Sequence, residues 1–74
     1  MELPRIDMKA TGEMIKASRI NTGMSVDDLR EAMGYVNPTT IYYWQRGRSL
    51  PTIDRFVELA HLFGTTVDDL IIRA

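Results

Sequence analysis

The chain has 74 residues, with nine Lys and Arg against ten Asp and Glu, a net charge of −1 and no cysteine. This length allows one small domain, the missing cysteine excludes a disulfide framework or a thiolate metal site, and the balanced charge argues against a nucleic-acid binder that relies mainly on long-range electrostatics. No apolar run approaches the roughly 20 residues of a membrane span, and the N-terminus carries no signal-peptide core, so we expect a soluble, cytoplasmic protein.

The first predicted helix follows a segment without a clear pattern. Residues 1–10 are expected to form an N-terminal arm, and residues 11–74 the folded domain. Thr11 can cap a helix over about residues 12–22, which Gly23 then ends.

The second and third predicted helices also carry local start and stop signals. Ser25 caps the second, whose acidic first turn favours the helix dipole, and Gly34 stands just after its end at Met33. The third has Asn37 as its cap, with proline at the first helical position, and is expected to cover residues 38–46 before a glycine ends it.

The last two predicted helices begin at residues 53 and 67, after threonine caps at Thr52 and Thr66. The sequence Gly-Thr-Thr-Val-Asp-Asp-Leu before the fifth helix matches Gly-Met-Ser-Val-Asp-Asp-Leu before the second. Two copies are too few for a repeat protein. We interpret both as one start signal, consisting of a turn, a cap, an acidic first turn and a buried Leu. Five helices without a convincing strand predict a compact, all-α bundle.

The third predicted helix has two distinct faces, because a helix turns about 100° per residue. Ile41 and Trp44 form an apolar stripe that we expect to be buried. The opposite face carries Thr39, Tyr43 and Arg46, with Tyr42 on its flank. Hydroxyl groups can donate or accept hydrogen bonds at base edges, and Arg can pair with guanine. The alternative is that both tyrosines cover hydrophobic surface within the domain.

A spaced set of residues links these helices to a known family. The set comprises Ile15, Lys16, Arg19, Gly23-Met24-Ser25, Leu29, Met33-Gly34, Thr40-Ile41, Trp44, Gly47, Pro51, Leu59-Ala60, Phe63-Gly64 and Leu70. It resembles the Cro and lambda-repressor (Xre-type) helix-turn-helix family over positions 15 to 70. The resemblance implies that the helix of residues 26–33 crosses the phosphate backbone and that the helix of residues 38–46 is the recognition helix in the major groove.

The resemblance also implies roles for individual residues. The positions that reach base edges are Thr39 and Tyr43, with Tyr42 beside them. The positions near the sugar-phosphate backbone are Asn37, Thr40, Arg46 and Arg48. Ser25 and the helix start behind it can offer N–H groups to a phosphate. The helical wheel assigns the same outward face without using the resemblance.

Three positions depart from the family pattern. The turn of residues 34–37 is one residue longer than usual, and Arg30 stands where the family favours Ala. We expect the alkyl stem of Arg30 to snorkel along the surface. Gln45 stands where the family commonly has a Glu that pairs with Arg19. An Arg–Gln hydrogen bond would leave Arg19 less well compensated and turned partly toward DNA phosphates.

The C-terminal half also offers a candidate dimer surface. On the fourth predicted helix, one face is shared by Ile53, Phe56, Val57, Ala60 and Phe63. Leu62 points away from this face, and with Ile71 and Ile72 it could form a self-complementary patch. The alternative is that these three residues close the small core. A two-fold dimer would read half-sites about one helical turn of DNA apart.

The leading hypothesis is a sequence-specific double-stranded DNA binder that regulates transcription, most simply as a repressor that occludes a promoter. The alternative is a protein-interaction module, such as an antitoxin or adaptor, that binds through its exposed tyrosines. The sequence has no nucleophile–base constellation, no metal-ligand spacing and no Gly-rich phosphate loop. His61 has no second ligand nearby, so no enzyme activity, metal, cofactor or small-molecule ligand is expected.

Overall fold

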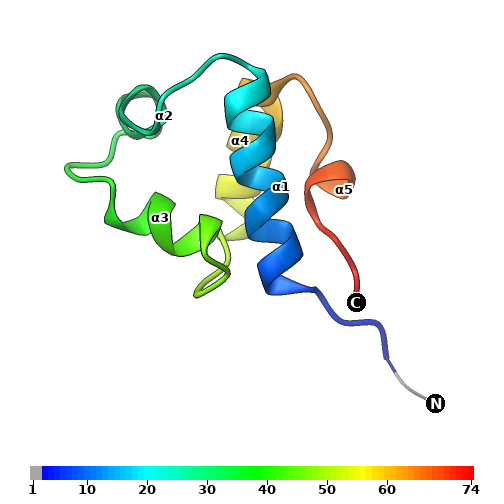
Figure 1. The fold of residues 1–74 in the computed structure, drawn as a ribbon. Coiled ribbons are helices and arrows are strands. Elements are labelled where there is room, and N and C mark those ends of the chain that lie inside the picture. The colour runs from blue at the N-terminus through cyan, green and yellow to red at the C-terminus, as the bar shows by residue number, and fades with distance from the viewer. Residues whose placement is uncertain (1–2) are drawn as a thin grey trace.

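The computed structural model describes residues 3–74, which fold into five helices and no strand. Helix α1 crosses the centre of the molecule, α2 and α3 lie on one side of it, α4 passes behind it, and α5 lies on the other side (Figure 1). Their bounds are Met8–Asn21 for α1, Val26–Met33 for α2, Thr39–Gln45 for α3, Ile53–Phe63 for α4 and Val67–Leu70 for α5. The all-α class is therefore as predicted. Within residues 3–74, no helix is long and apolar enough to cross a membrane.

Helices α2 and α5 share one start signal, as the sequence predicts. The hydroxyl oxygen of Ser25 accepts a hydrogen bond of 2.9 Å from the Asp28 amide, and Thr66 accepts one of 3.1 Å from the Asp69 amide. The leucine that follows each acidic first turn, Leu29 or Leu70, is completely buried. Each cap therefore places one apolar side chain in the core.

Helix α1 begins earlier than predicted. Its cap is Asp7, whose Oδ1 accepts a hydrogen bond of 2.9 Å from the amide of Ala10. The predicted cap, Thr11, is instead buried inside the helix, and its hydroxyl oxygen accepts a hydrogen bond of 3.0 Å from the Ile72 amide. The prediction of a helix start at Thr11 is therefore wrong, because a contact 61 residues away along the chain decides its role.

The segment expected to form an N-terminal arm, residues 1–10, is partly helical. Residues 8–10 belong to α1, while Met1 and Glu2 lie outside the described residues. Just before the helix, the amide of Asp7 donates a hydrogen bond of 2.8 Å to the carbonyl of Ile72. The two ends of the described chain therefore lie together, as Figure 1 shows.

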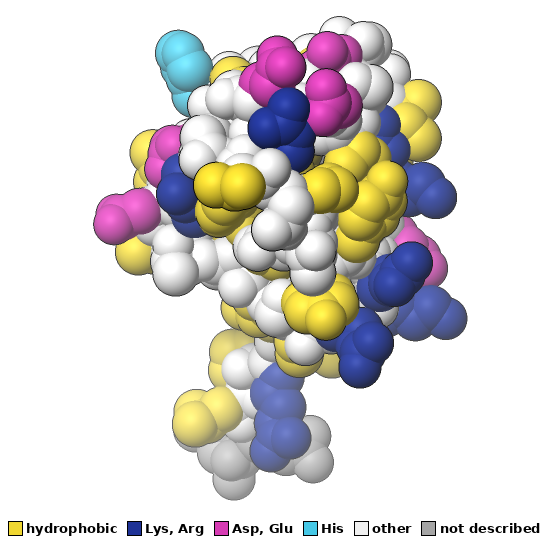
Figure 2. All heavy atoms as spheres, turned by 90° about the vertical axis from the view of Figure 1, so that its left-hand side faces the viewer, with side chains coloured by type: hydrophobic (Ala, Val, Ile, Leu, Met, Phe, Trp, Pro, Cys, Tyr) yellow, Lys and Arg dark blue, Asp and Glu magenta, His cyan; other side chains and the backbone are white. Residues whose placement is uncertain are grey.

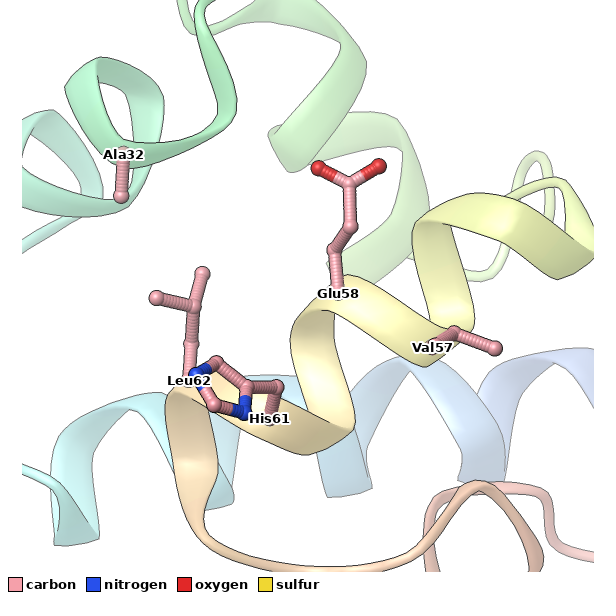
Figure 3. Close-up of a pocket in the computed structure, with 5 residues that line it drawn as sticks. All are labelled: Ala32, Val57, Glu58, His61 and Leu62. Carbon is pink, nitrogen blue, oxygen red and sulfur yellow. The ribbon is translucent and has the colours of Figure 1, made fainter.

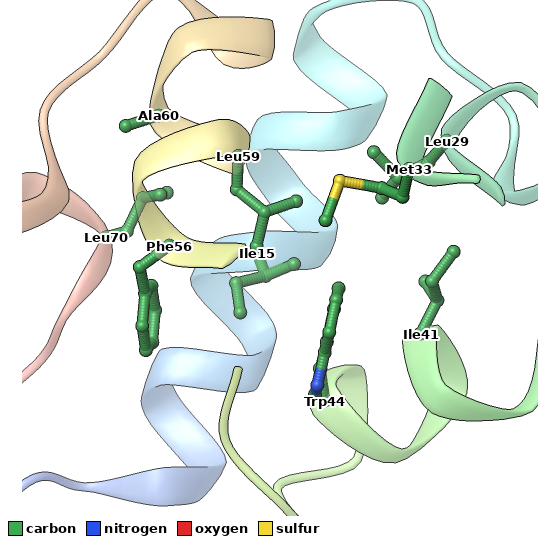
Figure 4. Packing of buried hydrophobic residues seen from close by; sticks show 9 residues of the cluster. All are labelled: Ile15, Leu29, Met33, Ile41, Trp44, Phe56, Leu59, Ala60 and Leu70. Atoms are coloured by element: carbon green, nitrogen blue, oxygen red, sulfur yellow. The ribbon is translucent and has the colours of Figure 1, made fainter. Parts of the chain in front are cut away.

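The core joins α1, α2, α3 and α4, with α5 closing one side. Its buried hydrophobic members are Ile15, Leu29, Met33, Ile41, Trp44, Phe56, Leu59, Ala60 and Leu70. Ile41 and Trp44 point from α3 toward the other helices (Figure 4). Gly12 lets α1 and α3 approach closely, since a Cβ on it would overlap the carbonyl oxygen of Trp44. The apolar stripe thus fixes α3 with its opposite face turned outward.

The bounds of α3 differ by one residue from the prediction at each end. Pro38 is the cap rather than the first helical residue, and Arg46 lies just after the helix. Asn37 still serves the helix start, because its Oδ1 accepts a hydrogen bond of 3.1 Å from the Thr39 amide.

Candidate nucleic-acid interface

The tyrosines and the tryptophan of α3 are divided between its two faces. Ile41 is fully buried and Trp44 is 2% exposed, whereas Tyr42 and Tyr43 are 40% and 42% exposed. Thr39, at the start of the helix, is also exposed. The predicted split of the aromatic triplet is confirmed, and the outward face of α3 presents hydroxyl groups and aromatic rings.

An arginine guanidinium lies over the ring of each exposed tyrosine. The guanidinium of Arg46 lies 5.8 Å from the ring centroid of Tyr42, and that of Arg48 lies 5.4 Å from the ring centroid of Tyr43. A cation at this distance from an aromatic face is attracted by the ring quadrupole. The rings therefore hold two positive charges beside the outward face of α3.

Gly47 lets the second arginine reach this position. Its φ of +72° belongs to the left-handed region, and a Cβ there would lie 2.7 Å from the Cα of Lys9 in α1. The chain thus reverses tightly against α1, and the amide of Arg48 donates a hydrogen bond of 2.9 Å to the carbonyl of Tyr43. A glycine is required here for both its conformation and its size.

A hollow of about 380 Å³ lies among α1, α3 and the first residue of α2. Its lining consists of Lys16, Arg19, Val26, Tyr42, Gln45 and Arg46. On the face that presents α2 and α3, Lys and Arg side chains gather along the right-hand edge, and Asp and Glu side chains lie mainly at the top and left (Figure 2). The local basic edge exists despite the overall charge of −1.

Arg19 and Gln45 meet inside this hollow. The Nε of Arg19 donates a hydrogen bond of 2.9 Å to Oε1 of Gln45, and its Nη1 donates one of 2.8 Å to the carbonyl of Met24. Arg19 is only 9% exposed. The expectation that Arg19 turns partly toward DNA phosphates is wrong, because the side-chain oxygen of Gln45 and the carbonyl of Met24 both accept hydrogen bonds from it and keep it buried.

The start of α2 is closed by a reciprocal pair of hydrogen bonds. The Ser25 amide donates a hydrogen bond of 2.9 Å to the carboxylate of Asp28. The amide of Asp28 in turn donates one to the Ser25 hydroxyl. These bonds, first from the Ser25 backbone and then from its side chain, hold the pKa of Asp28 below its ordinary value. The amides of Val26 and Asp27 precede any carbonyl of the helix that could accept from them, so they have no acceptor within α2.

Arg30 follows the buried Leu29 and forms ion pairs at the surface with Asp27 and Glu31. Its side chain is 23% exposed. Its Nε donates a hydrogen bond of 2.7 Å to the carboxylate of Asp27, and its Nη1 donates one of 3.0 Å to the carbonyl of Tyr35. The hydrogen bond to Asp27, together with the charges of Asp27 and Glu31, raises the pKa of Arg30. Besides the expected position along the surface, Arg30 makes a contact that the sequence did not indicate, its hydrogen bond to Tyr35 in the longer turn.

The proposed dimer residues are half-buried in this chain. Leu62 and Ile71 pack against the core, while Ile72 is bonded through its amide to Thr11. On α4, Ile53 and Val57 are 67% and 57% exposed, although the wheel groups them with buried Phe56 and Ala60.

A second hollow, of about 400 Å³, lies between α2 and α4. It is lined by Ala32, Val57, Glu58, His61 and Leu62. Ala32 and Leu62 approach it from opposite sides (Figure 3). Within residues 3–74, no group of three or more His, Asp and Glu residues could hold a metal ion.

Comparisons with known proteins identify the architecture. The chain is similar to the DNA-binding domain of BldD from S. venezulae, at 27% identity and a TM-score of 0.74, covering 88% of this chain and 96% of that one. It also resembles in fold the clp gene regulator ClgR from C. glutamicum, at 24% identity and a TM-score of 0.73, with 85% and 80% of the two chains covered.

A third solved structure, apo-HppE, shares 24% identity and a TM-score of 0.78, but only 36% of that chain is covered against 88% of this one. This likeness concerns the fold alone. No curated protein sequence matches the chain. The helix-turn-helix family model matches residues 15–70. Because that match spans most of the chain, the protein belongs to the helix-turn-helix family, in its Cro and lambda-repressor-like branch.

Proposed function

We propose that the protein binds double-stranded DNA in a sequence-specific manner and regulates transcription, with α3 in the major groove. The observation that carries this proposal is the outward face of α3, where Tyr42 and Tyr43 are exposed while Ile41 and Trp44 anchor the helix. Thr39, Tyr42 and Tyr43 would contact base edges, because hydroxyl groups and ring carbons suit the donors, acceptors and thymine methyl groups of the major groove.

Backbone contacts would come from the rim of this face. Arg46 and Arg48 flank the tyrosines, Asn37 and Thr40 lie at the start of α3, and Ser25 opens α2. Arginine side chains and amides at a helix start are suitable partners for phosphate oxygens. Such contacts fix the register of the protein on DNA, while the base contacts choose the sequence.

Two findings support the proposal independently of the side chains on α3. Membership of the helix-turn-helix family supports binding to double-stranded DNA. The similar BldD structure is itself described as a DNA-binding domain. We further propose repression by promoter occlusion, and a homodimer formed through Leu62, Ile71 and Ile72, whose two copies of α3 would read half-sites about one turn of DNA apart.

Selection of bound sequences from a random DNA pool tests the proposal. We expect one enriched motif, with two-fold symmetry if the protein binds as a dimer. Affinity for the enriched site should fall with salt, by a slope of about 0.9 per phosphate contact in a plot of log K against log salt concentration. A pool that stays random, with no measurable binding even at low salt, would contradict DNA binding.

That contrary result would favour a second function, docking onto another protein. Its support is the same pair of exposed tyrosines with arginines against their rings, since Tyr and Arg are enriched among the residues that dominate protein interfaces. The salt titration separates the two functions, because only phosphate contacts release the condensed counterions of DNA.

A further inference from the structure

The longer turn between α2 and α3 is held from α4 by Arg55. The Nη1 of Arg55 donates a hydrogen bond of 3.1 Å to the carbonyl of Met33, the last residue of α2. Its guanidinium lies 4.7 Å from the ring centroid of Tyr35, nearer than the guanidinium in either arginine–tyrosine pair around α3. The last carbonyls of a helix lack partners within it, so Arg55 supplies one while covering the ring in the turn.

Tyr35 in turn contacts α3 through Trp44. Its ring meets the indole of Trp44 edge to face, with centroids 5.9 Å apart and planes at 67°. Aromatic pairs favour this geometry and this separation. Because Trp44 is 2% exposed and anchors α3, the ring of Tyr35 lies against the anchor of the proposed recognition helix.

Arg55 and Tyr35 are each held by a further contact. Glu58, one turn along α4, accepts hydrogen bonds of 3.2 and 3.3 Å from Nη1 of Arg55. Arg30 donates to the carbonyl of Tyr35 at 3.0 Å. Arginines from two different helices therefore bind the carbonyl of Met33, just before the turn, and the carbonyl of Tyr35 within it.

We propose that Arg55 is a positioning residue that sets the orientation of α3 relative to α2 and so determines how well α3 discriminates between DNA sequences. The inference rests on the proposed function for its consequence in DNA binding. The direct contacts, which we call the clamp, are those from Arg55 to Met33 and Tyr35, and from Tyr35 to Trp44. Arg55 acts through these residues and contacts no base itself.

The variant Arg55→Met removes the guanidinium but keeps an unbranched side chain that suits a helix. Arg73→Met is its matched control, since it removes the same charge from a 70%-exposed side chain that pairs with Asp68 at the C-terminal end of the chain. Arg55→Lys keeps the charge and loses the planar fork that can bond a carbonyl while lying on a ring. Tyr35→Leu and Tyr35→Phe form a second pair, in which only the leucine variant loses the ring.

Amide hydrogen exchange of the free protein gives the first readout. The amide of Tyr35 is bonded to the carbonyl of Arg30 at 3.1 Å and reports on the turn. We expect Arg55→Met and Tyr35→Leu to speed its exchange about tenfold relative to amides in the middle of α1, with no such change in Arg73→Met or Tyr35→Phe. An unchanged ratio, or equal acceleration of all amides, would overturn the clamp.

Binding to the selected DNA site and to random DNA gives the second readout. We expect Arg55→Met to weaken binding to the selected site about tenfold and to leave binding to random DNA nearly unchanged, with Arg55→Lys also impaired. Equal losses on both DNAs, with a salt slope smaller by about one, would show that Arg55 contacts a phosphate and would overturn the inference.

The two readouts separate this inference from the function on which it rests. If the unaltered protein binds no DNA, the proposed function fails, and with it the consequence of the clamp for specificity. The exchange measurement still decides whether Arg55 holds the turn. If the unaltered protein binds its site and Arg55→Met retains the full specificity ratio, the clamp fails while the proposed function stands.

Discussion

Arg19 of α1 donates a hydrogen bond of 2.9 Å to the side-chain oxygen of Gln45, the last residue of α3. The same guanidinium reaches the carbonyl of Met24, in the loop that leads to α2. One side chain that is 9% exposed therefore ties three segments together behind the candidate interface. The pair takes the place of the Arg–Glu ion pair that the family resemblance suggests.

We predict that Gln45→Ala lowers the free energy of unfolding by about 2 kcal/mol, because a nearly buried guanidinium loses an acceptor. Gln45→Glu keeps an acceptor and adds a charge, so it should be at least as stable as the unaltered chain at neutral pH. Urea unfolding followed by circular dichroism measures both. An alanine variant as stable as the unaltered chain would show that the bond contributes little.

Gly12→Ala should destabilise the protein by about 2 kcal/mol or more, since the added methyl group meets the backbone of α3 and cannot be relieved by a side-chain rotation. The new Cβ would overlap the Trp44 carbonyl and lie 2.9 Å from that of Gln45. Thermal unfolding compares it with Glu13→Ala on the exposed side of α1, for which we expect a change within about 0.5 kcal/mol. Equal melting temperatures for the two variants would exclude the close approach of α1 and α3.

The stability of α2 should depend on the charge of Asp28. Hydrogen bonds from Ser25 lower the pKa of its carboxyl group in the folded chain. The carboxylate therefore stabilises the fold above the unfolded pKa of about 3.9, and this contribution is lost as the pH falls through the lower, folded pKa. Asp28→Asn should reduce the melting temperature at pH 7, and the difference from the unaltered chain should shrink below about pH 4. A difference that is independent of pH would contradict the role of the charge.

Local signals in the sequence predict most helix starts and the two faces of α3. Ser25 and Thr66 act as caps because each bonds an amide three residues away. The split between Tyr43 and Trp44 follows from helical periodicity. The contact of Arg46 with Tyr42 joins residues four apart, a spacing that brings side chains together on a helix, so it too could have been found from the sequence.

Contacts between distant segments account for what the sequence did not indicate. Asp7 and Thr11 are both suitable caps, and the bond from Ile72 to Thr11 decides between them. Arg55 reaches Met33 across 22 positions, so no local pattern indicates that it holds the turn. Arg19 remains inside because Met24 and Gln45 both accept from it, which depends on how α1 meets α3.

The central claim is that the outward face of α3 chooses the DNA sequence while the arginines beside it hold the backbone. The most direct test compares Tyr43→Ala with Arg48→Ala by measuring affinities for the selected site and for random DNA at several salt concentrations. We expect Tyr43→Ala to reduce the ratio of the two affinities, by about 1–3 kcal/mol if a base contact is lost. Arg48→Ala should weaken both DNAs similarly and lower the salt slope by about one. An unchanged ratio in Tyr43→Ala would contradict the assignment of this face.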